Sequence, residues 1–133
     1  MITLDTNVVI RLFEHDDATQ RALSVALFEH LTPEHTGFIP RECVIELAWV
    51  LTRCYRYSRT RLCAVMRMLL SRRELHIENA QRVAWATDQY QHSSFDFADL
   101  MILSAAKDNG AIPVKTFDTR FSRHEAVSLL RTH

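Results

Sequence analysis

Apolar residues recur along the chain with two spacings, which separate the expected helices from the expected strands. Three- and four-residue spacings predict helices over 6–13, 16–32, 41–55, 58–73, 80–91 and 97–109. Short apolar runs between them predict strands over 2–5, 36–40, 74–79 and 111–118, and the tail 119–133 is expected to hold one helical turn and a final strand. Strands that alternate with helices predict an α/β fold, with a central, mostly parallel sheet covered on both faces by helices.

Residues with helix-capping chemistry stand at the expected helix ends. Side-chain caps are expected from Thr6 or Asn7, Ser58, Asn79 and Asp96. Pro40 suits the first turn of the helix that follows it, because a proline has no N–H to lose there. Gly110 is expected to end the helix before it in the left-handed conformation.

The length and composition predict a single domain, residues 1–133. A chain of 133 residues that is 47% hydrophobic can bury a core without disulfides or a structural metal. Cys43, Cys54 and Cys63 form no CxxC pair and are odd in number, so we interpret them as buried small hydrophobes in a reducing compartment. No segment approaches the ~18 apolar residues of a membrane helix, which predicts a cytoplasmic protein without a membrane partner.

The formal net charge of zero predicts no anionic partner by itself, but the charges are unevenly distributed. Residues 47–73 contain seven arginines and no Asp or Glu. The stretch RCYRYSRTR, at a predicted helix–helix turn, holds Arg53, Arg56, Arg59 and Arg61 together with Tyr55 and Tyr57. Arginine binds phosphates and tyrosine stacks on unpaired bases, so this turn is predicted to form one wall of an RNA groove. The alternative is a solvated turn whose tyrosines pack between helices.

Two aspartates, Asp5 and Asp118, each follow a predicted strand directly. Ligands bind beyond the carboxyl ends of strands in open parallel sheets, so the two side chains are expected to share one crevice. The alternative is that each aspartate only opens a turn or caps the next element.

The helices add two pairs of acids whose surroundings differ. Glu42 and Glu46 lie about 40° apart around a helix and point the same way. Glu42 is favoured by the helix dipole in the first turn, whereas Glu46 stands among apolar residues and requires an ion pair, with Arg53 as one candidate, or a metal. Asp99 is placed in the same way, one turn after Asp96. We interpret Asp99 as facing a polar crevice at the start of its helix.

Four acids, Asp5, Glu46, Asp99 and Asp118, are thus predicted to lie close together. Several ionised carboxylates repel one another strongly unless a divalent cation neutralises them. Oxygen ligands suit Mg²⁺ or Mn²⁺, which activate water and hold phosphate oxygens. Zinc is disfavoured because the seven histidines show neither HxH nor HExxH spacing.

The stretches ITLDTNVVI, ECVIELAWVL, FDFADLMILSAA and VKTFDTRF resemble, in this order, the PIN-domain ribonucleases, and the short chain is similar to VapC-type toxins of bacterial toxin–antitoxin pairs. The resemblance implies a PIN-like three-layer α/β/α domain with Asp5, Glu46, Asp99 and Asp118 as the catalytic metal ligands. Residues expected to support these ligands are Thr6, Asn7, Asp96 and Thr116, with Glu42 as a further structural or functional candidate. Leu100 departs from the family, many members of which carry Ala there.

The resemblance also implies an activity and partners. Such proteins cut single-stranded or loop RNA with Mg²⁺ and leave a 5′-phosphate and a 3′-hydroxyl. A small antitoxin would cover the acidic crevice, and homodimers are common in the family; the apolar faces of LCAVMRMLL could serve either contact or the core. The alternatives are a PIN-like module that binds RNA or protein without cutting, and a PIN nuclease that is not a toxin. A haloacid dehalogenase-type phosphatase is disfavoured because Asn7 stands where that class needs a second acid.

Overall fold

The structure, a computed structural model, describes residues 1–132 of the chain. Its helices are α1 (Thr6–Phe13), α2 (Ala18–Glu29), α3 (Arg41–Arg53), α4 (Arg59–Ser71), α5 (Ala80–Gln91) and α6 (Phe97–Asp108), with a short 3₁₀ helix η1 (Phe121–Arg123). Its strands are β1 (Ile2–Thr3), β2 (Gly37–Ile39), β3 (Leu75–Ile77), β4 (Val114–Thr116) and β5 (Val127–Leu129). The predicted α/β fold is confirmed, and every predicted element is present, including the helical turn and strand of the tail.

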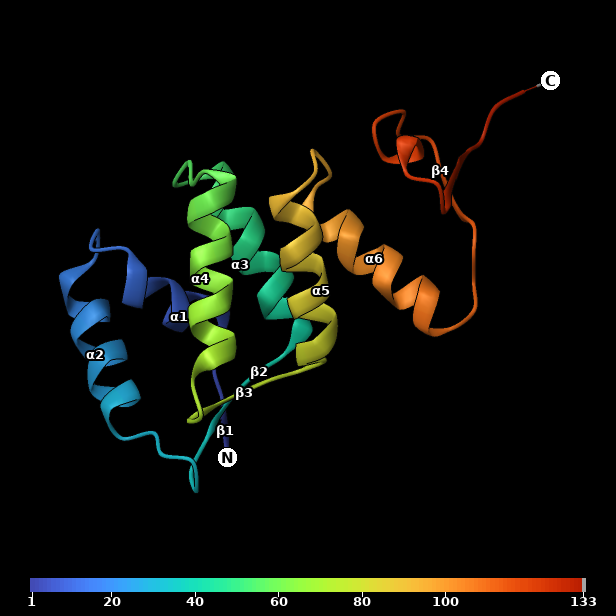
Figure 1. The fold of residues 1–133 in the computed structure, drawn as a ribbon. Coiled ribbons are helices and arrows are strands. Elements are labelled where there is room, and N and C mark those ends of the chain that lie inside the picture. Colours follow the sequence, from blue (N-terminus) through green and yellow to red (C-terminus); the bar gives the residue numbers. More distant parts are fainter. Residues whose placement is uncertain (133) are drawn as a thin grey trace.

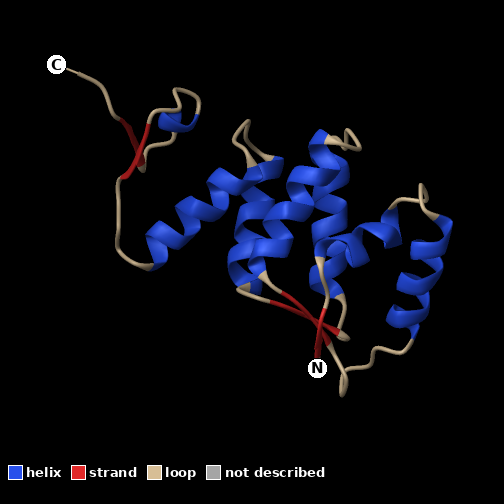
Figure 2. Cartoon of the chain, turned by 180° about the vertical axis from the view of Figure 1, so that it is seen from behind, coloured by secondary structure: helices blue, strands red, loops and turns tan. Residues whose placement is uncertain are grey.

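All strand pairs are parallel, and they form two separate sheets. One sheet has the order β1–β2–β3, with Ile2 opposite Gly37 and Gly37 opposite Leu75. The second sheet consists of β4 and β5, with Val114 opposite Val127. Figures 1 and 2 show the first sheet below the bundle of helices and the second beyond α6, so the strands do not join into the single central sheet that we expected.

The main core lies between the first sheet and the helices that cover it. Its fully buried side chains come from nearly every element up to α6, among them Leu4, Ile39, Leu51, Leu62 and Leu100. Gly37 lets β2 approach its neighbours, because a Cβ there would lie 2.7 Å from Leu4 Cδ1. The apolar face of α4 that we considered for a partner contact belongs to this core, and the buried residues there include Leu62, Cys63, Val65, Met66 and Leu69.

A second, smaller core joins α6 to residues 109–132, which we call the C-terminal unit. Its buried members are Leu103, Phe121 and Val127, and Phe95 packs edge-to-face on Phe121 with ring centroids 6.3 Å apart. The predicted stop after α6 is confirmed, since Gly110 follows the helix at a φ of +62°.

Several local predictions are wrong. The N-cap of α1 is Asp5, whose carboxylate accepts a hydrogen bond from the Thr6 N–H, and not Thr6 or Asn7. Asp96 and Asn79 precede α6 and α5 but make no side-chain capping bond; Asn79 is left-handed, with a φ of 53°. Cys54 is exposed and Cys43 is half-buried, whereas Cys63 is buried as expected. Ser58 does cap α4, by accepting from the Arg61 N–H.

Pro40 also differs from expectation, because it occupies the N-cap position of α3 and not its first turn. None of the helices within residues 1–132 combines the length and apolar character that crossing a membrane requires.

Candidate active site

An open cleft of about 400 Å³ lies between the start of α6 and the loop after β4, and we call it the acid cleft. Its acids are Asp96, Asp99 and Asp118, and its other polar lining includes Arg120 and Arg123. The carboxylate of Asp96 is free to face the cleft because it makes no capping bond. The predicted polar crevice at the start of this helix is therefore present.

Asp99 is an acid of this cleft whose pKa is raised by its surroundings. It is half-buried, in contrast to the exposed Asp96 and Asp118. Burial raises the pKa of Asp99, and the negative charges of Asp96 and Asp118 raise it further. Because its ionised form is disfavoured, a carboxyl group in these surroundings is stabilised by a nearby cation, whether that cation is an arginine, a proton or a metal ion.

Asp118 is held by the local backbone. Its carboxylate accepts hydrogen bonds from the N–H groups of Arg120, at 2.8 Å, and of Phe121, at 3.1 Å, and so starts η1. Its own N–H donates to the hydroxyl of Thr116 at 3.0 Å. Thr116, which we expected beside the acids, thus orients the loop that carries one of them.

Asp5 stands at the other sheet, after β1. Its side chain is tied to the start of α1 and lies 3.9 Å from Cys43 Sγ. Behind it, the Thr6 side chain is 3% exposed, and its hydroxyl has no hydrogen-bond partner within residues 1–132. Asn7 is exposed in the first turn.

Glu46 projects from the second turn of α3 and is exposed. Its carboxylate makes no hydrogen bond or ion pair with a side chain of residues 1–132, so Arg53 is not its partner. Glu42 forms an ion pair with Arg41 at 3.5 Å on the surface. The predicted free-energy cost of burying the Glu46 carboxylate does not arise, because the exposed carboxylate is solvated.

The structure therefore brings Asp99 and Asp118 together and leaves Asp5 at a different sheet. The reason is the strand order, since β4 pairs with β5 and not with β1. Within residues 1–132, no three His, Cys, Asp or Glu side chains lie close enough together to hold a metal ion. Of the four predicted metal ligands, the acid cleft therefore holds Asp99 and Asp118, and one or two carboxylates with several waters are a common way of holding Mg²⁺.

The arginine- and tyrosine-rich turn between α3 and α4 is anchored to the rest of the protein. Tyr57 is buried and donates to Glu14 at 2.8 Å, while Arg61 stacks on its ring at 3.7 Å. Tyr55 donates to Asp16 at 2.7 Å. These contacts match the alternative in which the tyrosines pack between helices, and they leave the Tyr57 ring unavailable to a base.

Two other arginines of the predicted RNA wall differ in whether their guanidinium groups contact the rest of the protein. Arg59 donates to the Tyr90 carbonyl at 3.0 Å and stacks on the Tyr90 ring at 4.0 Å. Arg56 is exposed at a left-handed position, with a φ of 59°, and makes no side-chain hydrogen bond within the described chain. Arg56 is therefore accessible to a phosphate, and so is the exposed Arg53, which likewise makes no side-chain hydrogen bond within the described chain.

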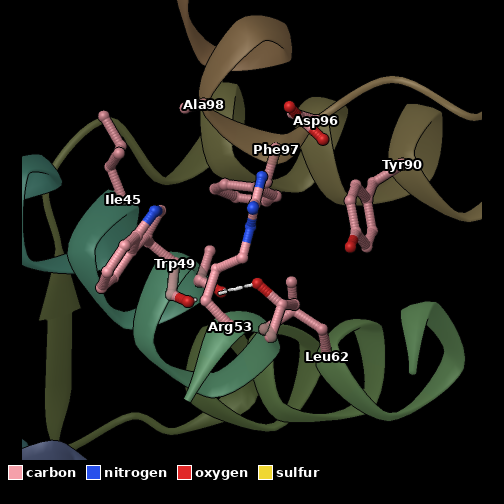
Figure 3. Close-up of a pocket in the computed structure, with 10 residues that line it drawn as sticks. Ile45, Trp49, Arg53, Leu62, Tyr90, Asp96, Phe97 and Ala98 are labelled. Carbon is pink, nitrogen blue, oxygen red and sulfur yellow. Dashed lines mark hydrogen bonds between the residues drawn. The ribbon is translucent and has the colours of Figure 1, made fainter. Parts of the chain in front are cut away.

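A groove of about 80 Å³ between α3 and α6 adds a residue that the sequence analysis missed. Figure 3 shows Trp49 and Arg53 on one side of it and Phe97 and Asp96 on the other. Trp49 is 58% exposed, which is unusual for a large aromatic side chain. Its position three residues after Glu46, on the same helical face, was the signal available in the sequence.

Comparison with known proteins agrees with this architecture. A protein-family model described as the PIN domain matches residues 2–127, which include every helix and strand up to the start of β5. The helices and parallel strands are consistent with an α/β/α domain of that kind. No curated protein matches the chain at a significant level.

Proposed function

This chain belongs to the PIN domain family, and on that basis we propose that it is an Mg²⁺-dependent endoribonuclease and the toxin of a toxin–antitoxin pair. PIN domains are typically nucleases that use divalent metals and bind RNA. The ligands that we propose are Asp5, Glu46, Asp99 and Asp118, with Mn²⁺ as an alternative ion. The protein would act in the cytoplasm as a single domain.

The acid cleft carries this proposal. Asp99 is half-buried beside two further carboxylates, and an acid with a raised pKa in a cleft is typical of functional sites. Arg120 and Arg123 line the same cleft and could hold phosphate oxygens next to the acids. The combination suits a phosphodiester substrate better than a neutral one.

Arg53, Arg56, Arg59 and Arg61 are proposed to hold the RNA away from the reacting bond. Residues 47–73 contain no acid that would repel phosphates. Arg53 in the α3–α6 groove and Arg56 at the turn lie on the same stretch of chain as the exposed Trp49, whose ring can stack on an unpaired base.

The test is RNA cleavage by the purified chain with Mg²⁺ or Mn²⁺, against EDTA. We expect cuts that leave 5′-phosphates and 3′-hydroxyls. Asp99→Asn is expected to reduce the rate by about 10²-fold or more, because it removes a charged ligand. Asp88→Asn is the matched control, since Asp88 is an exposed acid of α5 outside the cleft, and it should cut like the wild type.

The alternative function is a PIN-like module that binds RNA or protein without cutting. The absence of a group of three metal-ligating side chains within residues 1–132 favours it. If neither the wild type nor Asp99→Asn cuts RNA or is stabilised against heat by Mn²⁺, the binding module is the better account. If Mn²⁺ stabilises the wild type against heat but not Asp99→Asn, and neither cuts RNA, the result would support a nuclease whose RNA target was absent from the assay.

A small antitoxin is the proposed protein partner. The α3–α6 groove is lined by Trp49 and Phe97 and also by Asp96 of the acid cleft. A segment that filled the groove could therefore cover the acids as well. The product of a small gene beside this one should inhibit cleavage, and Trp49→Ala should weaken that inhibition. If no such gene lies beside this one, the better account is a nuclease that is not a toxin.

A further inference from the structure

The α3–α6 groove contains a tyrosine hydroxyl to which residues 1–132 supply no partner. Tyr90 of α5 is 7% exposed and lines this groove. Its backbone carbonyl accepts a hydrogen bond from Arg59, but its hydroxyl makes no hydrogen bond within the described chain. Buried tyrosine hydroxyls usually have a hydrogen-bond partner, so this one is available to a molecule that enters the groove.

Two opposite charges line the same groove without pairing. Arg53 is the last residue of α3, and Asp96 directly precedes α6. Figure 3 shows the Arg53 side chain extending from α3 across the groove toward the ring of Phe97, with Asp96 beyond it. Within the described chain neither charged side chain forms an ion pair, and Asp96 makes no capping bond. The groove therefore offers guanidinium donors and a carboxylate acceptor to one ligand.

A large aromatic surface accompanies these polar groups. Trp49 is 58% exposed, and Figure 3 shows it next to Arg53 at the groove. Exposed aromatic side chains stack on unpaired bases in proteins that bind single-stranded nucleic acids. The ligand that matches an aromatic face, a free carboxylate and a free guanidinium is planar and carries hydrogen-bond donors and acceptors along its edges. A nucleobase has this form.

We propose that the α3–α6 groove binds a guanine base and so selects the RNA sequence. Trp49 stacks on the face of the base, and the Asp96 carboxylate accepts hydrogen bonds from N1–H and from the N2 amino group. Arg53 donates to O6 and N7, the acceptors that arginine commonly binds on guanine. The Tyr90 hydroxyl is a further polar group for the same ligand.

The carboxylate makes the groove selective for guanine among the four RNA bases. Guanine presents two neighbouring donors, N1–H and the N2 amino group, and a carboxylate can accept from both. Adenine and cytosine present a ring nitrogen acceptor beside their amino group, and uracil presents a single N–H between two carbonyl oxygens. Each of these bases would place an acceptor against the Asp96 carboxylate, and this repulsion lowers its affinity.

The base belongs to an unpaired guanosine of RNA, because pairing with cytosine would occupy the edge that Asp96 binds. Asp96 lines the acid cleft as well as the groove, so this guanosine lies next to the bond that is cut. The placement beside the cut bond rests on the proposed function, whereas the preference for guanine does not.

The test is the binding of fluorescently labelled uridine oligomers that differ in one central base, G, A or C, measured by anisotropy in EDTA. EDTA removes any contribution of a metal, and the ratio of two affinities cancels the phosphate contacts that the oligomers share. We expect the wild type to bind the G oligomer at least about tenfold more tightly than the A oligomer. Asp96→Asn should reduce this ratio by about fivefold or more, because an amide has only one acceptor oxygen and carries donors of its own.

Asp88→Asn is the matched control, at an acid of α5 outside the groove, and it should keep the full ratio. Asp96 and Asp88 are both exposed, so both variants should fold. Arg53→Gln should also lower the preference for the G oligomer, since it removes the guanidinium that binds O6 and N7.

Equal affinities of the wild type for the three oligomers, no binding of any of them, or a full preference retained by Asp96→Asn would each overturn the proposal. GMP that bound as tightly as the G oligomer would overturn the assignment to RNA and identify a free guanine nucleotide as the ligand. The readout needs neither metal nor cleavage. A guanine preference without any cleavage would therefore overturn only the proposed function, and metal-dependent cleavage without the preference would overturn only this inference.

Discussion

The two parallel sheets of this protein are each followed by an aspartate, yet the hydrophobic cores that pack against the two sheets differ greatly in size. The three-stranded sheet with Asp5 adjoins a core to which all six helices contribute, whereas the C-terminal unit with Asp118 has only Leu103, Phe121 and Val127 as its buried apolar contacts. A two-stranded sheet is at best marginally stable without such packing. The difference predicts that the C-terminal unit opens at a lower free energy than the three-stranded sheet.

The largest expected effect is in the main core. Leu62→Ala should lower the free energy of unfolding by about 3 kcal/mol, because Leu62 is fully buried and its removal leaves a cavity. Urea denaturation followed by circular dichroism measures this. Leu23→Ala, at a residue of α2 that is 68% exposed, is the control and should change stability by less than about 0.5 kcal/mol. Equal effects would show that the core is not where we place it.

The second prediction concerns the small core. Phe121→Ala should destabilise the C-terminal unit by about 2 kcal/mol and leave the urea midpoint of the helices nearly unchanged, because Phe121 packs only within the second core. Hydrogen exchange should accelerate over 109–132 and not over α3 or α4. A parallel loss of protection in all helices would mean that the two regions unfold as one.

The third prediction concerns the Tyr57 contact, which joins α1 to the arginine-rich turn. Tyr57→Phe should cost about 1.5 kcal/mol at neutral pH, because it removes the hydrogen bond to Glu14. Burial and this bond raise the pKa of Tyr57 to about 12. The folded state therefore holds the phenol proton longer than the unfolded state, and the wild type should lose stability as the pH rises from about 10 to about 12.

Unfolding curves at pH 9 and pH 12 test this comparison. The loss of stability between the two values should be smaller in Tyr57→Phe than in the wild type, because the variant has no phenol there to ionise. An identical alkaline loss in both proteins would show that Tyr57 titrates normally and that its burial has no energetic consequence.

The smallest expected effect lies on the surface. Arg56→Asn should reduce the slope of log K for RNA binding against log salt by about 0.7, the value for one lost phosphate contact on a single strand. Asn tolerates the left-handed backbone at this position. Arg73→Gln, an exposed arginine beyond the other end of α4, is the control. An unchanged slope for Arg56→Asn would remove this turn from the RNA groove.

The sequence predicted the elements well because their signals are local. The helical spacings, the Ser58 cap and the turn at Gly110 depend on neighbouring residues and are confirmed. The caps at Asp96 and Asn79 failed because a capping residue type does not fix the side-chain direction. Tyr57 was ambiguous from the sequence, since its partner Glu14 is 43 residues away.

The part of the candidate site that the sequence predicted also depends on local signals. Asp99 and its crevice follow from one apolar helix, whose first turn holds an isolated acid. The expected crevice shared by Asp5 and Asp118 required β4 to lie beside β1, and no local pattern specifies which strands become neighbours. Strand-end acids identify candidates, and the sheet order decides which of them meet.

Mn²⁺ binding by calorimetry to the wild type, to Asp5→Asn and to Asp118→Asn tests most directly whether acids from both regions form one site. We predict binding by the wild type and little by either variant. Full binding by either variant would contradict the claim that both regions supply the metal ligands.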